Sequence, residues 1–411
     1  METSALSKLN GYTPILRLQV GLGLLAFILM GVNDGLIGVL LPSIRGYYGV
    51  DKGTVSLIFL AATLGYLTSA FSSGPLSAKI GTRNLLLLGL SSYVLGVTLV
   101  SLVVPFLVFP FCLYFSGLGI GIIDAGLNSY FVNFPRSTVL MNTLHAFYGV
   151  GALIGPLVAS GMLALDFFWA NCYIVLVIVG LVVLAGIVFI FRHNPFPDLH
   201  AKPAAGDAPQ RGILSTALRV RNVWLCAAFL LFYVGVEVSM GTWSYSLLTE
   251  ERHQDTLLSG WAVSGYWLGL TLGRLILGHV GERIGNKRLI QWCLAGVVVG
   301  VLLVWVAPFE IISAAGLVLT GFSLGPLFPT TITLISGLVP ARVVATAIGF
   351  AASLGSMGAA FFPWFTGNLA QWFGLWTLLP FMVVLTAGML AVWFFLLARS
   401  RPNSVEEPGP A

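Results

Sequence analysis

The chain has 411 residues, of which 57% are hydrophobic and 9% are charged, and its mean hydropathy is +0.95. A soluble domain carries about 25% charged residues, so this composition excludes an ordinary soluble protein. The formal charge of +5 would suit nucleic acid, but the basic residues lie in short segments between apolar runs, so we expect no such partner. The four cysteines have neither disulfide nor metal spacing, and we expect no metal and no cofactor.

Twelve apolar runs follow one another along the chain, and a membrane-crossing helix needs about 20 such residues. They lie near 18–44, 54–77, 84–104, 106–132, 138–165, 167–191, 223–248, 257–279, 289–308, 311–338, 343–368 and 373–398. The stretch at 192–222 is rich in proline and alanine, which is typical of a linker. We predict an all-α membrane protein with a six-helix bundle at 1–191, a linker at 192–222, a second six-helix bundle at 223–398 and a tail at 399–411.

The distribution of lysine and arginine predicts how the chain lies in the membrane. With both termini in the cytoplasm, 16 of the 20 basic residues are cytoplasmic, Arg45, Lys52 and Arg252 lie outside, and Arg274 lies within a helix. Cytoplasmic segments of membrane proteins carry an excess of Lys and Arg. We therefore expect a multi-pass protein of the plasma membrane, surrounded by lipid, with both termini and the linker in the cytoplasm.

The first half aligns with the second without a gap when the sequence is shifted by 204 residues. Of the 17 glycines in residues 31–151, eight then meet another glycine, where about two are expected from 48 glycines in 411 residues. The pairs are Gly31–Gly235, Gly65–Gly269, Gly74–Gly278, Gly81–Gly285, Gly96–Gly300, Gly117–Gly321, Gly121–Gly325 and Gly151–Gly355. A duplicated six-helix unit in one orientation is a transporter architecture, with the site near mid-membrane between the halves.

Two loops at corresponding places in the halves carry the same motif. The first reads Gly74-Pro-Leu-Ser-Ala-Lys79-Ile-Gly81-Thr-Arg83, and the second reads Gly278-His-Val-Gly-Glu282-Arg283-Ile-Gly285-Asn-Lys287-Arg288. The glycines permit a tight turn, and the basic residues hold the loop in the cytoplasm. The motif resembles the loop signature of the major facilitator superfamily, which implies a twelve-helix transporter.

In that family an acidic residue in the loop pairs across it and latches the inner gate. Glu282 matches this position in the second copy, whereas Ala78 replaces the acid in the first. The candidate gating residues are Lys79, Arg83, Arg274, Glu282, Arg283, Lys287 and Arg288. For the loop cations, simple anchoring of short cytoplasmic turns is the alternative, and Arg274 could also snorkel or pair with Glu282.

Three further motifs resemble the fucose/glucose/galactose–proton symporter branch of the superfamily. They are Gly31-Val-Asn33-Asp34-Gly35 with Leu41-Pro42, then Gly117-Leu-Gly-Ile-Gly121-Ile-Ile-Asp124-Ala-Gly-Leu-Asn128, and Met141-Asn142-Thr-Leu-His145-Ala-Phe-Tyr148-Gly149-Val-Gly151. In that branch one carboxylate on the first helix and another on the fourth handle the proton and the sugar. The resemblance implies these roles for Asp34 and Asp124.

Read without the family, Asp34, Asp124 and Glu237 are acids inside apolar runs. A charge at mid-bilayer costs at least about 2.5–3.5 kcal/mol, so such residues usually face a cavity and serve a pathway. Desolvation disfavours the charged form of a carboxyl group, which favours proton binding. The alternatives are a structural hydrogen bond or a buried pair with Arg274. Counted along their helices, Asp34 and Asp124 differ in depth by on the order of 10 Å, which favours a relay over a shared proton.

Polar and aromatic residues near these acids complete the predicted site. Asn128 lies one helical turn from Asp124 on the same face, and Asn142, His145 and Gly149 form a stripe on the fifth helix. The candidate substrate-binding residues are Asn33, Asn128, Asn142, His145, Tyr148, Glu237, Trp243 and Tyr245. A packing role for His145, and interfacial anchoring for Trp243 and Tyr245, remain the alternatives.

These features favour a monomeric secondary transporter, with proton-coupled symport of a sugar or similar small polar solute as the leading hypothesis. A proton-driven exporter of drugs or metabolites could use the same acids, and a sensor built on a transporter scaffold is a further alternative. The sequence has no metalloprotease or serine-hydrolase motif and no cysteine–histidine cluster, so we do not expect an enzyme.

Overall fold

The computed structural model describes residues 14–132, 137–190, 213–306 and 309–399. Within these ranges the chain forms helices and turns and contains no strand. The first half comprises α1 (Pro14–Tyr48), α2 (Lys52–Val55), α3 (Leu57–Ser101), α4 (Phe109–Phe131), α5 (Ser137–Ala164) and α6 (Ala170–Ile190). The second half comprises α7 (Ile213–Leu218), α8 (Arg221–Ser246), the π-helical turn η2 (Leu247–Glu251), α9 (Thr256–Ile284), α10 (Asn286–Val306), α11 (Glu310–Leu324), α12 (Leu327–Leu338), η3 (Ala341–Val343), α13 (Val344–Phe373), η4 (Leu375–Thr377) and α14 (Leu378–Arg399).

The predicted all-α membrane fold is confirmed, and the middle of each predicted apolar run lies in helix except near Pro326. Among the described residues, ten stretches are long and apolar enough to cross a membrane. One of them, Lys52–Ser101, contains two predicted runs, and Gly81 divides it because its φ of 78° is not helical. The run that remains is α9, whose glycine, serine, tryptophan and tyrosine residues, together with Arg274, lower its mean hydropathy. The run at 311–338 is interrupted near Pro326, which lacks the N–H that a continuous helix needs.

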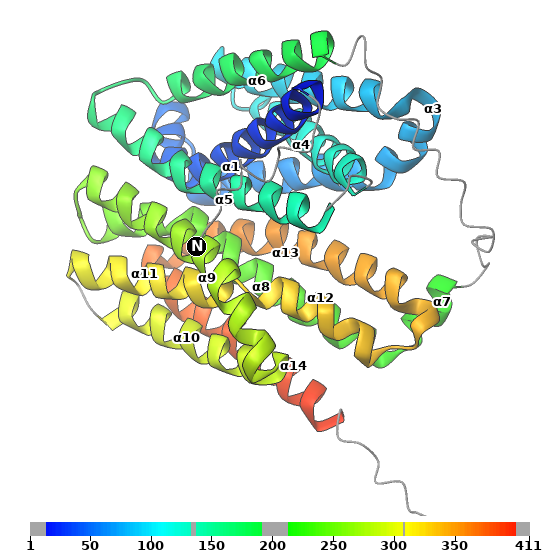
Figure 1. Cartoon of the computed structure of the whole chain (residues 1–411). Coiled ribbons are helices and arrows are strands. Elements are labelled where there is room, and N and C mark those ends of the chain that lie inside the picture. Colours follow the sequence, from blue (N-terminus) through cyan, green and yellow to red (C-terminus); the bar gives the residue numbers. More distant parts are fainter. Residues whose placement is uncertain (1–13, 133–136, 191–212, 307–308, 400–411) are drawn as a thin grey trace, which may run out of the picture.

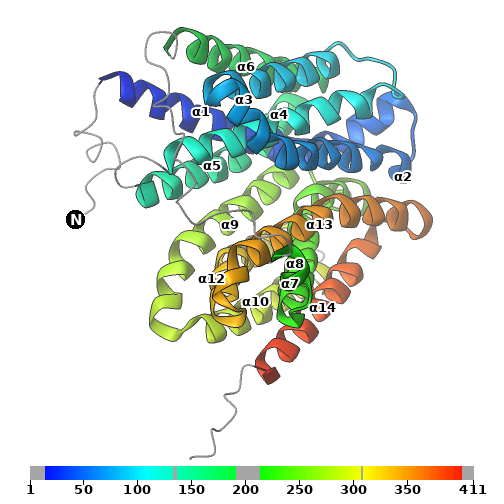
Figure 2. The same cartoon turned by 90° about the vertical axis from the view of Figure 1, so that its right-hand side faces the viewer.

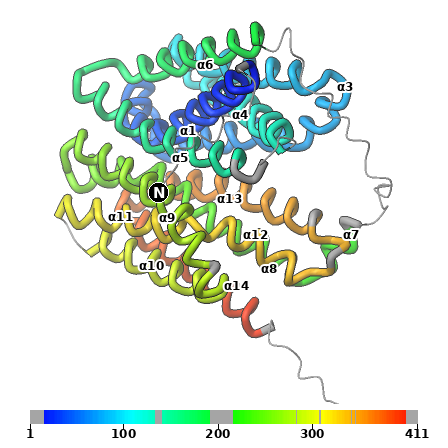
Figure 3. The backbone as a smooth tube through the Cα atoms, viewed as in Figure 1, coloured from blue at the N-terminus to red at the C-terminus, as the bar shows by residue number. Residues whose placement is uncertain are grey.

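The two halves form separate helical bundles that pack against each other. In Figure 1 the blue-to-green first half lies above the green-to-red second half, and the view turned by 90° in Figure 2 shows the same division. The tube in Figure 3 follows the chain through the first bundle before it enters the second. The predicted linker and tail lie mainly outside the described residues, which resume at 213 and end at 399.

Paired glycines set the closest helix packing, and the repeat is visible in it. A Cβ atom on Gly117 of α4 would overlap the carbonyl oxygen of Ala62 on α3, and one on Gly65 of α3 would overlap that of Tyr114 on α4. The partners at the 204-residue shift behave in the same way, because Gly321 meets the Tyr266 carbonyl and Gly269 meets the Val318 carbonyl. Small residues let membrane helices approach to backbone contact.

The two motif loops also keep their predicted geometry. Gly81 and Gly285 have φ values of 78° and 86°, a conformation that side-chain-bearing residues rarely adopt. The expected glycine turn is therefore confirmed in both copies. These turns lie at the end of the bundle where α1 begins and α14 ends, which we call the terminal end. We call the opposite end, where residues 45–56, 102–109, 165–169, 247–256 and 371–377 connect the helices, the distal end.

Three sets of helices join the halves: α1 packs on α8, α5 packs on α9, and α2 and α3 pack on α13. A Cβ atom on Gly38 of α1 would lie 2.7 Å from the carbonyl oxygen of Thr242 on α8. One on Gly149 of α5 would overlap the Thr271 hydroxyl of α9. These close approaches place the middle of α1, which carries Asp34, and the middle of α5 directly against the second half.

Candidate functional site

Asp34 lies in the middle of α1 and accepts hydrogen bonds on both carboxylate oxygens. The Asn33 amide donates to Oδ1 at 3.1 Å, and the Tyr148 hydroxyl on α5 donates to Oδ2 at 2.8 Å. Backbone contact between α1 and α5 at Gly31 and Gly151 brings Tyr148 within reach. The structure therefore unites three predicted site residues in one cluster.

Asp124 forms a second cluster of the same chemical kind. The Tyr66 hydroxyl on α3 donates to Oδ2 at 2.9 Å, and the Asn128 amide, one turn along α4, donates to Oδ1 at 2.8 Å. The Oδ1 atom of Asn128 is buried and has no hydrogen-bond partner among the described residues. Because each aspartate has its own tyrosine and asparagine, the arrangement agrees with the expectation that the two carboxylates do not share a proton directly.

Glu237 of α8 and Arg274 of α9 form an ion pair within the second half. The Arg274 Nη2 to Glu237 Oε1 distance is 3.0 Å, and the side chains are 33% and 12% exposed. Arg274 Nε also donates to the Gly325 carbonyl at 3.3 Å, and the Tyr266 hydroxyl donates to the Glu237 carbonyl at 2.8 Å. Of the alternatives weighed for these residues, the buried pair is the one that the structure contains.

The first-half carboxylates and the second-half ion pair lie near one another across the interface. Gly38 of α1 contacts Thr242 of α8. One helical turn earlier on the same two helices lie Asp34 and Val238, the neighbour of Glu237. Asp34 and Glu237 therefore lie at similar depth. Tyr148 is within electrostatic range of Asp34, Glu237 and Arg274, and His145 is within range of Asp124 and Arg274. The centre of the molecule thus holds three acids, one arginine and one histidine.

The α5 stripe shows from which side this centre is reached. Gly149 is buried against Thr271 of the second half, but His145 and Asn142, one and two turns nearer the terminal end, are exposed. The ring of Phe27 meets the His145 ring edge-on at a centroid distance of 5.5 Å. Along this face the halves touch at Gly149, whereas the side chains nearer the terminal end are exposed.

Trp243 and Tyr245 lie inside the second half, not at an exposed helix end. Trp243 is 1% exposed, and its indole N–H donates to the Pro363 carbonyl at 2.9 Å. Tyr245 is 3% exposed. This environment is that of packed core aromatics, so contact of either ring with a solute stays a prediction.

The predicted gating residues lie around the motif turns. Lys79, Arg283, Lys287 and Arg288 are exposed, and Arg83 is half-buried with Nη2 3.4 Å from the Val188 carbonyl of α6. The side chain of Glu282 lies outside the described residues. A gating role for this set therefore remains a prediction, whereas Arg274 has the Glu237 partner described above.

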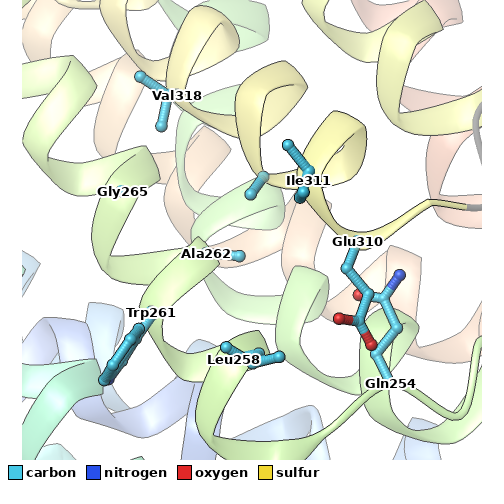
Figure 4. Close-up of a pocket in the computed structure, with 9 residues that line it drawn as sticks. Gln254, Leu258, Trp261, Ala262, Gly265, Glu310, Ile311 and Val318 are labelled. Atoms are coloured by element: carbon cyan, nitrogen blue, oxygen red, sulfur yellow. The ribbon is translucent and has the colours of Figure 1, made fainter.

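A pocket between α9 and α11 lies apart from the acids. It is lined by Gln254, Leu258, Trp261, Ala262, Gly265, Glu310, Ile311, Ala314 and Val318, and Figure 4 shows Glu310 and Gln254 side by side at its edge. Trp261 and Ile311 are largely exposed, which places the pocket on the lateral surface near the distal end. None of the three central acids lines it, so it is not the candidate transport site.

Sequence reasoning missed Tyr66 and the Tyr148 hydrogen bond to Asp34. Tyr66 is 58 residues from Asp124 and lies on another helix. No motif marks it, because its partner at the 204-residue shift is Leu270. The one available signal was its position next to Gly65, because Gly65 matches Gly269 under the 204-residue shift and such a matched glycine indicates a helix contact.

Two packed helical bundles with hydrogen-bonded acids inside their apolar helices are typical of a membrane transporter. The model of the Major Facilitator Superfamily matches residues 23–252 and again 225–411. The chain belongs to this superfamily, as the loop motifs predicted, and it is a transporter and not an enzyme.

Known proteins with similar sequences or folds include named transporters. The chain is 26% identical over 400 residues to Bypass of stop codon protein 6 of Saccharomyces cerevisiae, covering 88% of this chain and 79% of that protein. It is 21% identical over 395 residues to the glucose/mannose transporter GlcP of Bacillus subtilis, covering 93% and 94%. A D-xylose–proton symporter shares the fold with a TM-score of 0.75 at 13% identity, covering 93% and 97%. FucP in its outward conformation has a TM-score of 0.62 at 18% identity, covering 92% and 98%.

Proposed function

We propose that this transporter carries out proton-coupled symport of a sugar or a similar small polar solute, with Asp34 and Asp124 binding the protons. The observation that carries the proposal is the matched environment of the two aspartates, each with a tyrosine hydroxyl and an asparagine amide donating to it. A carboxylate held this way inside a membrane protein can exchange a proton without leaving its site.

Charge balance gives a physical reason for coupling. With both aspartates ionised, the centre has a net negative charge, because Arg274 offsets only Glu237. When both aspartates are protonated and His145 is neutral, the remaining charges cancel. Rearrangement of the halves then moves no uncompensated charge through a low-dielectric region, where such a charge is costly. Proton loading is therefore expected to favour the conformational change.

Polar groups beside the aspartates support a polyhydroxylated solute. The buried Asn128 Oδ1 atom lacks a partner among the described residues, and the exposed Asn142 amide and His145 imidazole can both donate and accept hydrogen bonds. The names of the B. subtilis relative and of the xylose symporter are those of sugar transporters, which agrees with this choice. The basic residues of the motif turns support termini in the cytoplasm of a plasma-membrane protein.

The first experiment identifies the solute and tests the coupling. A thermal-shift screen of the purified protein against sugars, nucleosides, organic acids and lipophilic cations, run at two pH values, selects a ligand. Proteoliposomes are then given an inward proton gradient, and uptake of the radiolabelled ligand is followed. We expect accumulation by the wild type, and loss of gradient-driven accumulation by at least about tenfold in Asp34→Asn and Asp124→Asn.

Asp166→Asn provides a matched control, since Asp166 is exposed at a distal turn of the same half. Uptake that does not depend on the gradient, and that is the same in wild type and both central variants, would refute proton coupling. If the protein moved only lipophilic cations, and moved them only in exchange for protons, the result would favour the exporter. Binding without transport of any ligand would favour the sensor.

A further inference from the structure

The halves are joined at the distal end by a cluster of polar contacts that the proposed transport chemistry does not use. Glu250 of η2, in the second half, pairs with Arg45 of α1 at 2.7 Å and with Lys52 of α2 at 3.6 Å. The backbone N–H of Lys52 donates to the Gln371 side chain of α13 at 3.0 Å. We refer to Arg45, Lys52, Glu250 and Gln371 as the distal latch.

Each latch contact joins one half to the other. Arg45 and Lys52 belong to the first half, and Glu250 and Gln371 belong to the second. Both ion pairs end on the same Oε2 atom, so Glu250 holds two first-half elements at once. The side chains are 21–23% exposed, which leaves them accessible to water but partly desolvated.

Close packing continues inward from the latch. A Cβ atom on Gly53 of α2 would lie 2.8 Å from the Asn368 side-chain oxygen of α13, and one on Gly367 would overlap the Ser56 hydroxyl. On the other flank, a Cβ atom on Gly260 of α9 would overlap the Ser160 side chain of α5. The distal end is thus shut along both flanks, whereas Asn142 and His145 are exposed toward the terminal end.

We infer that the distal latch stabilises the distally closed state of the transporter relative to the distally open one, and that this stabilisation depends on Glu250. Opening the distal end requires the halves to separate there, which breaks both ion pairs on one carboxylate. A partly exposed ion pair shifts an equilibrium by roughly 1.4-fold to fivefold. Losing both ion pairs is expected to raise the ratio of distally open to closed molecules by roughly twofold to thirtyfold.

The test measures the separation of the halves directly and needs no solute. Spin labels are placed at Leu107→Cys in the first half and Trp372→Cys in the second, two exposed distal positions, since the four native cysteines are buried. Double electron–electron resonance then reports the distance distribution in nanodiscs. We expect a short distance in the wild type, a larger long-distance fraction in Glu250→Gln, and a similar but smaller change at about 1 M salt, which screens exposed charges.

Glu251→Gln is the matched control, because Glu251 lies in the same turn and makes no ion pair with a described residue. The charge reversal Glu250→Arg together with Arg45→Glu and Lys52→Glu recreates both ion pairs with opposite signs and should restore the short distance, and Arg45→Gln serves if Glu250→Gln does not fold. An unchanged distribution in Glu250→Gln overturns the inference. So does an opening that Glu251→Gln reproduces or that charge reversal leaves in place. Because no transport is measured, these outcomes are independent of the proposed proton coupling.

Discussion

Replacing either member of the Glu237–Arg274 pair is expected to destabilise the protein more than replacing both. Glu237→Gln leaves the Arg274 charge in the centre with only neutral acceptors, among them the Gly325 carbonyl, and Arg274→Met leaves an uncompensated carboxylate. Breaking a buried pair by removing one partner costs about 3–5 kcal/mol, and partial exposure of Arg274 moves the expected loss toward about 3 kcal/mol. The double variant removes both charges and should recover part of this loss.

Thermal unfolding in detergent measures this effect. We expect each single variant to lower the transition temperature by about 5 °C or more, and the double variant to lie closer to wild type. Arg288→Met makes the same chemical change at an exposed position on α10 and should leave the transition nearly unmoved. Single variants as stable as wild type would show that the pair contributes nothing measurable to the fold.

The same variants separate structural from functional roles. If the pair only stabilises the second half, the double variant should recover transport along with stability. If Glu237 or Arg274 also contacts the solute or moves during gating, the double variant should be stable and inactive. Because the Arg274 side chain is 33% exposed and so within reach of a solute, we expect the second result.

The scaffold was predictable from the sequence because its determinants are local or repeated. Apolar runs long enough to cross a bilayer have few alternatives to helix, and the shift of 204 residues matched glycines whose close contacts the structure then showed in both halves. Gly81 and Gly285 illustrate this, since a turn with positive φ needs glycine wherever it occurs.

The polar site was predictable only in part, because its partners come from helices far apart in sequence and do not repeat. The three acids were found since a charge in an apolar run is conspicuous. The partners Asn33, Asn128 and Tyr148 were candidates because they lie in the symporter-branch motifs. Tyr66 was not, because a tyrosine in a membrane helix has no distinctive spacing. Under the 204-residue shift Tyr148 and Arg274 correspond to Ala352 and Ala70, so neither polar residue has a counterpart in the other half. Duplication thus supplied the frame, and the polar residues of the two halves then diverged.

The glycine contacts also allow the sharpest prediction about the fold. Gly117→Ala and Gly321→Ala, which are equivalent under the repeat, each place a methyl group where a facing carbonyl oxygen lies. The carbonyl belongs to a helix backbone and cannot rotate away as a side chain could, so α3 and α4, or α9 and α11, must move apart. Overpacking usually costs about 1–3 kcal/mol, and separation of two long helices places these substitutions at or above the upper value.

We therefore expect both variants to lower the transition temperature in detergent by about 5 °C or more and to reduce the yield of monodisperse protein. Gly161→Ala is the control, because Gly161 lies within α5 and a Cβ atom there meets nothing within 4 Å. It should be neutral or slightly stabilising, since alanine is the better helix former by about 1 kcal/mol. Equal effects at Gly117 and Gly321 would mean that the duplicated contact is equally tight in the two halves. A tolerant Gly321 alone would mean that the second half packs more loosely than its geometry indicates, and tolerance at both would contradict the backbone contact itself.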